Sequence, residues 1–213
     1  MKVIYEDNHL LVVEKPINVP MQADSSKDED LLNMAKAYIK EKYQKPGDVY
    51  LGLVHRLDRP VGGVCVFART SKAASRLSTQ IAQHSFKKQY LAVVEDNGLD
   101  QSGHFEDLLL KDGTTNTVRV DPKGKKAILD YEVLKRKDGL ALVKVDLKTG
   151  RSHQIRVQFA SRGFPLWGDQ RYNKKAIAGQ QIALWSHLIE FDHPTTKERM
   201  SFSCDIDRYP FDI

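Results

Sequence analysis

Residues 126–147 read Lys-Ala-Ile-Leu-Asp-Tyr-Glu-Val-Leu-Lys-Arg-Lys-Asp-Gly-Leu-Ala-Leu-Val-Lys-Val-Asp-Leu. Two runs rich in apolar and β-branched residues, Lys126–Leu134 and Leu140–Leu147, flank a short polar link, which is typical of two antiparallel strands. Three further strand-like runs come before them: Gln89–Val94, Phe105–Leu110 and Thr115–Val120. Successive strands with short links predict an antiparallel or mixed sheet.

Strand-like runs also begin and end the chain, at Lys2–Tyr5, His9–Glu14, Gly63–Ala68, Ile182–Phe191 and Arg199–Ser203. Three helices are predicted: Asp28–Gln44, a second that Thr70 or Ser71 caps, and Ser152–Arg162 with Gly163 as its C-terminal cap. The pattern therefore predicts the α+β class, with a mixed, largely antiparallel sheet flanked by a few helices. Since no linker or internal repeat divides the chain, we expect one domain over residues 1–213.

Bulk properties are those of an ordinary globular protein: 213 residues, 41% hydrophobic and 29% charged. No apolar run approaches the roughly 18 residues of a membrane span, and acids at Glu6 and Asp7 stand where a signal peptide would stay apolar. Cys65 and Cys204 match no metal-binding spacing, so we expect two reduced, buried thiols. These features favour a cytoplasmic protein without a membrane partner.

The net charge of +5 is unevenly distributed. Residues 51–175 carry 23 Lys and Arg against 13 Asp and Glu, whereas the segments on either side are net acidic. A basic centre suggests a polyanionic ligand such as nucleic acid, and a solvated lysine-rich surface is the alternative.

A first candidate site lies at residues 55–63, His-Arg-Leu-Asp-Arg-Pro-Val-Gly-Gly. Asp58 stands between Arg56 and Arg59, and His55 comes just before them. Cations beside a carboxylate keep it ionised, and glycines let a ligand approach the backbone, so Asp58 is a candidate nucleophile or base. A surface turn with local ion pairs is the alternative interpretation.

A second candidate site lies at residues 149–159, Thr-Gly-Arg-Ser-His-Gln-Ile-Arg-Val-Gln-Phe. We expect Arg151 in the first turn of a helix and Arg156 one turn further on, where helix dipole and guanidinium groups would both attract anions. An arginine paired with a structural carboxylate is the alternative. Neither cluster offers a second carboxylate, and the arginines would repel a metal cation, so we expect no metal site.

Tyr90 belongs to a run that begins with Lys87 and Lys88 and then turns apolar. An aromatic ring beside lysines suits a protein that stacks a base and holds its phosphate, although a tyrosine in a strand more often packs in a core.

Together, three segments resemble the signatures of RluA-type pseudouridine synthases, in the same order: the HRLD and Gly-Gly of residues 55–63, KQYLA at 88–92 and GRSHQIR at 150–156. Weaker similarity at residues 12–16, 163–172 and 191–194 extends the resemblance over nearly the whole chain. Family members often have Thr-Ser-Gly where this chain has Pro60-Val61-Gly62, which puts loop-shaping hydrogen bonds in doubt. Many relatives begin with an S4 RNA-binding domain, which we do not expect here.

The resemblance implies the pseudouridine synthase fold and a cofactor-free isomerisation of uridine in tRNA or rRNA stem-loops. It assigns the catalytic carboxylate to Asp58, the stacking ring to Tyr90 and the basic partner of the aspartate to Arg156. Arg56 matches the arginine that helps displace the target nucleotide from its stack, and Arg151 and His55 are further candidates for RNA binding. We expect a monomer that needs no protein partner.

Two other functions remain open. A catalytically idle RNA-binding or RNA-folding protein could keep the same scaffold, and an N-glycoside hydrolase could release free uracil. Tritium release from labelled RNA separates the first from a synthase, and product mass separates the second.

Overall fold

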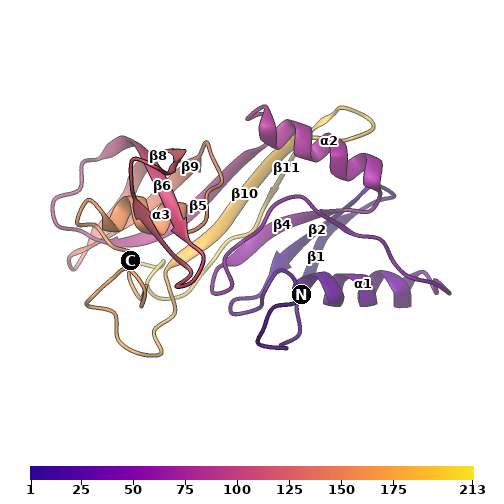
Figure 1. Cartoon of the computed structure of the whole chain (residues 1–213), viewed down its shortest axis with the longest axis horizontal. Helices are drawn as coiled ribbons and strands as arrows, with labels where there is room; N and C mark the ends of the chain where they lie inside the picture. The colour runs from indigo at the N-terminus through magenta and orange to yellow at the C-terminus, as the bar shows by residue number, and fades with distance from the viewer. The chain divides into compact units, whose positions relative to one another are not determined.

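The computed structural model describes all residues, 1–213, as three helices and eleven strands (Figure 1). They form two compact units, and each of these is made of two segments of the sequence. Unit 1 comprises Met1–Lys87 and Ser186–Asp205, and unit 2 comprises Lys88–Trp185 and Ile206–Ile213. No helix has the length and apolarity that a membrane crossing requires.

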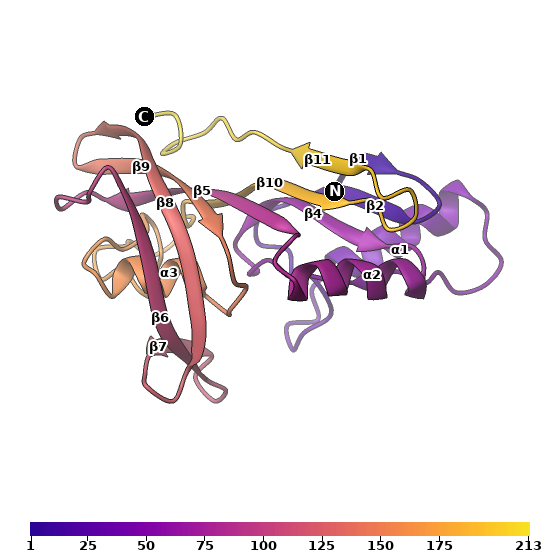
Figure 2. The ribbon, with the colours of Figure 1, turned by 90° about the horizontal axis from the view of Figure 1, so that it is seen from above.

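Unit 1 contains a sheet in which β1, β2, β4 and β10 follow one another, with β11 beside β10 and β3 beside β4. Its elements are β1 Lys2–Glu6, β2 Leu10–Lys15, α1 Leu31–Lys42, β3 Gly52–Leu53, β4 Gly62–Ala68, α2 Ser71–Ala82, β10 Leu184–Asp192 (from Ser186 on) and β11 Arg199–Ser203. The central strands β2 and β4 are almost completely buried. Figure 2 shows α1 and α2 on the same side of β1, β2 and β4.

Both helices of unit 1 begin where a side chain can accept a backbone N–H. Asp30 caps α1 by accepting from the N–H of Asn33 at 3.0 Å, and Thr70 caps α2 by accepting from that of Ala73 at the same distance. Such caps satisfy N–H groups that lack a partner inside the helix. They explain why α1 begins at Leu31, three residues after the predicted start.

Gly63 shows why this sheet needs glycine at one position. Its φ is +116°, and a Cβ there would lie 2.2 Å from the backbone oxygen of Ser186 in β10. The Ser186 hydroxyl in turn donates to the carbonyl of Val64 at 2.8 Å. Any side chain at position 63 would therefore force apart two strands that now lie in contact.

Unit 2 contains an antiparallel sheet in the order β5-β9-β8-β6-β7. Its elements are β5 Lys87–Glu95 (from Lys88 on), β6 Ser102–Asp112, β7 Thr117–Val120, β8 Lys125–Lys137, β9 Leu140–Leu147 and α3 Gln154–Ala160, with the first two residues of β10. Phe159 of α3 lies within 5.4 Å of the rings of Phe105 and Tyr131, measured between ring centroids. This aromatic cluster packs the helix on one face of the sheet.

The α+β class predicted from the sequence is confirmed, and every strand pair with a described register is antiparallel. Cys65 and Cys204 are buried and form no disulfide, as expected. The predicted helix Ser152–Arg162 is too long, because α3 spans only Gln154–Ala160. That residues 1–213 act as one catalytic domain stays a prediction.

Candidate active site

The Asp58 loop, residues 54–61, connects β3 to β4 in unit 1. Its last turn is closed by the N–H of Val61, which donates to the carbonyl of Asp58 at 3.0 Å. Leu57 is buried, whereas Asp58 keeps partial exposure and Arg56 points to solvent. Burial of Leu57 thus anchors the loop, while the charged side chains of Arg56 and Asp58 remain at least partly exposed to solvent.

Lys15 supports this loop from inside the protein. Its side chain is fully buried at the end of β2, and its Nζ donates to the carbonyls of Pro16, Arg59 and Val61 at 3.1, 2.9 and 2.6 Å. Two of those carbonyls belong to the loop itself. An ammonium has three protons to donate, so this one is matched by three acceptors.

Charge also couples Lys15 to the loop. Burial lowers the pKa of Lys15 to about 8, while the carboxylate of Asp58 acts in the opposite direction. A buried cation therefore lies beneath the loop that carries Asp58. Sequence reasoning considered only the neighbouring arginines as cations near Asp58 and missed Lys15.

Arg59 forms ion pairs outside the loop. Its guanidinium pairs with the carboxylate of Asp28 and lies 3.5 Å from that of Asp24, both in the segment before α1. That Arg56 and Arg59 hold Asp58 ionised stays a prediction. These exposed pairs tie the loop to residues 24–28, at a small gain in stability.

His55 is buried and holds the start of the loop against β4. Its Nε2 accepts the N–H of Val66 at 3.1 Å, and its ring lies 5.5 Å from that of Phe86. A nitrogen that accepts a backbone N–H carries no proton, so the ring is neutral in this arrangement. This geometry favours a loop-positioning role for His55 over direct RNA binding.

The second segment lies in unit 2, where three residues predicted to be helical form a turn instead. Arg151, Ser152 and His153 precede α3, and His153 has a left-handed backbone with a φ of +50°. A helix dipole near Arg151 is therefore not the source of anion binding that the sequence suggested. With seven residues, α3 is itself short.

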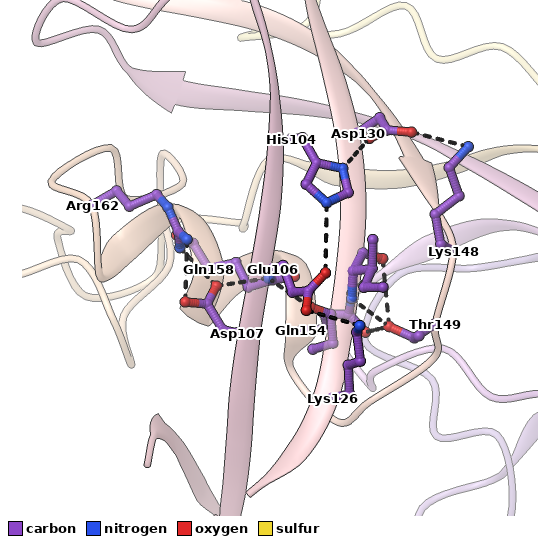
Figure 3. A network of polar contacts seen from close by, with 12 residues as sticks. His104, Glu106, Asp107, Lys126, Asp130, Lys148, Thr149, Gln154, Gln158 and Arg162 are labelled. Atoms are coloured by element: carbon purple, nitrogen blue, oxygen red, sulfur yellow. Dashed lines mark hydrogen bonds and ion pairs between the residues drawn. The ribbon is translucent and has the colours of Figure 1, made fainter. Parts of the chain in front are cut away.

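Gln154 fixes the point at which α3 begins. Its Oε1 accepts from the hydroxyl of Thr149 at 2.8 Å and from the N–H of Arg151 at 3.0 Å. Its Nε2 donates to the carbonyl of Ile128 in β8 at 3.0 Å. Figure 3 shows Gln154 and Thr149 joined beside β8.

The other end of α3 is fastened to β6. Asp107 accepts from Gln158 at 2.8 Å and from both Nη groups of Arg162, at 2.8 and 3.1 Å (Figure 3). With contacts at both ends, the helix is held in a fixed position on the sheet. Arg156 lies between these two anchors.

Arg156 is buried and pairs with a carboxylate that sequence reasoning did not identify. Its Nε and Nη2 donate to the two oxygens of Asp169 at 2.8 and 2.7 Å. Asp169 is also buried and accepts the N–H of Arg171 at 3.0 Å. A bidentate pair fixes the plane of the guanidinium, so Asp169 orients Arg156.

Arg156 also lies over the ring of Tyr172, with its Cζ 5.2 Å from the ring centroid. The Tyr172 hydroxyl accepts the N–H of Val118 at 2.9 Å and lies 2.7 Å from Nδ1 of His153. Either group can be the donor in this contact, depending on the tautomer of His153. Tyr172 thus connects the turn before α3 with Arg156.

The other two predicted residues of unit 2 differ in exposure. Tyr90 is buried in β5, opposite Val145 of β9. Arg151 is exposed, and its Nε donates to the carbonyl of Lys126 at 2.8 Å. Of the six site residues predicted from the sequence, three therefore lie in the Asp58 loop of unit 1, and the other three lie in unit 2. That the two groups form one site stays a prediction.

No cluster of three or more His, Cys, Asp or Glu side chains is arranged to hold a metal ion. The chemistry available to these residues is that of a carboxylate, guanidinium groups and an aromatic ring.

Comparison with known proteins identifies the family. The sequence profile described as RNA pseudouridylate synthase matches residues 9–161, a span that includes all three signature segments. The chain belongs to this family. It is therefore an RNA pseudouridine synthase, an isomerase that binds RNA as its substrate.

Curated relatives agree with the RluA-type assignment. This pseudouridine synthase is 31% identical to ribosomal large subunit pseudouridine synthase D of Zymomonas mobilis, over 97% of this chain and 69% of that protein. It is 32% identical to the synthase D of Pseudomonas aeruginosa, over 95% of this chain and 67% of that protein.

Solved structures support the fold of the synthase. The human RNA pseudouridylate synthase domain containing 4 aligns with a TM-score of 0.82 at 20% identity, covering 99% of this chain and 90% of that one. The human RNA pseudouridylate synthase domain containing 1 aligns with a TM-score of 0.75, also at 20% identity, covering 96% and 83%.

Proposed function

We propose that this synthase isomerises specific uridines of structured RNA, with Asp58 as the catalytic carboxylate. The observation that carries the proposal is the family match over residues 9–161, which contains Asp58, Tyr90 and Arg156. Two ribosomal large subunit synthases among the relatives favour rRNA as the substrate, and a tRNA stem-loop is the second candidate.

In the proposed reaction, Asp58 initiates cleavage of the bond between N1 of uracil and C1′ of ribose. The freed base turns, and its C5 forms a bond to C1′. The proton of C5 then leaves to solvent and N1 gains a proton, so RNA mass is unchanged. Whether Asp58 attacks C1′ or assists formation of a glycal, the reaction needs an ionised carboxylate at neutral pH.

Supporting residues have proposed roles in the same reaction. Tyr90 stacks on the extruded uracil, Arg156 pairs with the aspartate, and Arg56 helps displace the nucleotide. Extrusion costs a few kcal/mol, which contacts to flanking RNA offset. We further propose that the enzyme acts as a cytoplasmic monomer without a cofactor.

Release of tritium from RNA labelled at C5 of uridine tests the function, because only attack through C5 frees that atom. Asp58→Asn, which keeps the shape of the side chain, should lower turnover by about a thousandfold or more while RNA binding stays near wild type. Asp48→Asn removes the charge of an exposed aspartate and serves as the matched control.

Each outcome selects one function. Wild-type turnover by Asp58→Asn would refute the catalytic assignment. A wild-type protein that binds RNA but releases no tritium from any cellular RNA would instead be the idle RNA-binding protein. Free uracil among the products would identify a hydrolase.

A further inference from the structure

Lys88 occupies an unusual position for a lysine. It is the second residue of β5, where it pairs with Leu147 of β9, and its side chain is partly buried. Side chains alternate between the two faces of a strand, so Lys88 and Tyr90 share one face while Lys87 lies on the other. Two residues along a strand span about 7 Å, a distance on the scale of one nucleotide.

The Lys88 ammonium lies directly under the turn that precedes α3. A Cβ on Gly150 would be 3.0 Å from Nζ of Lys88, closer than ordinary van der Waals contact. Gly150 itself is exposed, so the lysine head group is separated from solvent by a residue without a side chain. Glycine at position 150 leaves room above the ammonium for a ligand atom.

The ammonium of Lys88 has no partner in the protein. It makes no hydrogen bond or ion pair, and burial alone lowers the pKa of Lys88. Lysines on the other face of the same sheet are paired: Lys126 lies 2.8 Å from Glu106, and Lys148 lies 3.1 Å from Asp130 (Figure 3). A partly buried ammonium without a counter-ion is unfavourable, and an anionic ligand would relieve that cost.

We propose that Lys88 and Gly150 form a subsite for one backbone phosphate of the substrate RNA, next to the nucleotide that stacks on Tyr90. This inference rests on the proposed function of the enzyme. Lysine binds phosphate as a compact point charge and needs no fixed fork geometry. The net charge of residues 51–175, 23 cationic against 13 anionic side chains, favours the same ligand.

Salt dependence of RNA binding tests the subsite. The probe is a single-stranded oligouridylate, and Kd is measured against KCl concentration for wild type, Lys88→Met and Lys87→Met. Loss of one phosphate contact on a single strand should reduce the slope of log K against log salt by about 0.7. We expect Lys88→Met to raise Kd about tenfold at low salt, which corresponds to about 1.4 kcal/mol.

Lys87→Met is the matched control, because Lys87 is the adjacent lysine on the opposite face of the strand. Its side chain is exposed and lies 3.4 Å from Glu190. We expect its Kd to stay within twofold of wild type and its slope to be unchanged. Lys88→Arg restores the charge and should restore most of the slope.

Gly150→Val provides a second variant in case Lys88→Met fails to fold. It fills the space above Nζ without removing the charge, so the expected result is again weaker binding with a reduced slope. A wild-type slope in a folded Lys88→Met, or in Gly150→Val, would overturn the subsite. A higher Kd with an unchanged slope would do so too, because it would indicate a packing role.

Failure of the proposed function gives a result that differs from failure of the phosphate subsite. If wild type releases no tritium from any RNA, the function is refuted while the binding slopes still report on the subsite. If wild type is active and Lys88→Met binds and reacts like it, only the subsite is refuted.

Discussion

Replacing Lys15 by methionine is the most direct test of how the Asp58 loop is held. Methionine keeps most of the side-chain volume, so the change removes the ammonium and leaves packing largely intact. Three carbonyls, those of Pro16, Arg59 and Val61, lose their donor. Two of them lie in the Asp58 loop, so that loop should lose its shape first.

The expected change in the free energy of unfolding is the difference between two opposing contributions: the hydrogen bonds that are lost and the unfavourable burial of a charge that is relieved. Hydrogen bonds from a charged donor contribute about 1.5–3 kcal/mol each, so three of them contribute roughly 4–9 kcal/mol. Against this, the lowering of the pKa of Lys15 from 10.5 to about 8 corresponds to about 3 kcal/mol of unfavourable burial. We therefore expect Lys15→Met to lower the free energy of unfolding by about 3 kcal/mol at pH 7.

Urea denaturation at pH 7 measures this change, with Lys2→Met as the control, because Lys2 is exposed and makes only a 4.0 Å contact with Glu14. The control should lose less than about 0.5 kcal/mol. A Lys15→Met protein as stable as that control would refute the reasoning. Turnover should fall through kcat more than through KM, since the loop carries Asp58, the carboxylate that we propose to be catalytic.

The pH dependence supplies an independent check on Lys15. Its folded-state pKa lies below the unfolded value, so between pH 8 and 10.5 the unfolded chain binds more protons at this site. The contribution of Lys15 to stability therefore rises with pH across that window by up to about 3 kcal/mol. The stability difference between wild type and Lys15→Met should widen correspondingly, and a constant difference would contradict the burial of a charged lysine.

Two further predictions concern other charged groups. Asp169→Asn should lower stability by about 3 kcal/mol and reduce kcat more than RNA affinity, because Arg156 loses its bidentate partner; wild-type kcat in steady-state assays would contradict this. Burial opposes ionisation of Glu6, yet hydrogen bonds from two tyrosines and a lysine lower its pKa to about 2. The stabilisation from Glu6 is thus present above pH 4.5 and lost as pH falls towards 2, so urea denaturation of Glu6→Gln should show a weaker acid dependence by about 2 kcal/mol. If the stability of Glu6→Gln fell at acidic pH as steeply as that of wild type, this contribution would be excluded.

The sheet of unit 2 was predictable because its strands follow a simple pattern. Along β8, Ala127, Leu129, Tyr131 and Val133 are buried, while the residues between them are exposed or partly exposed. Such alternation is a local property of the sequence and depends little on distant residues. The class of the fold followed from it.

The start of α3 could not be predicted for a physical reason. Ser152 and His153 precede an apolar helical pattern and look like a first turn, but His153 adopts a left-handed backbone. What makes this possible is the side chain of Gln154, which bonds the turn and the neighbouring strand β8. Contacts between segments 26 residues apart leave no periodic signal in the sequence.

Candidate site residues could be found from the sequence where several charged residues lie close together along the chain, as around Asp58. Lys15 and Asp169 were missed because their partners are distant: Val61 lies 46 residues after Lys15, and Asp169 lies 13 residues after Arg156. One signal for Lys15 does exist, since a lysine two residues after the buried run Leu10–Val13, in the same strand, has little access to solvent.

The discontinuity of unit 1 has a consequence for synthesis of the protein. The carbonyl of Val64 accepts a hydrogen bond from the hydroxyl of Ser186, so this bond can form only after β10 has been synthesised. Pairing of β11 also requires β10 to be present. At ~5–20 residues per second, a ribosome needs about ten seconds to travel from Lys87 to Asp205. During that interval the edge of β4 that pairs with β10 is open to pairing with other chains, so the unit that carries Asp58 needs protection until residues 186–205 have been made.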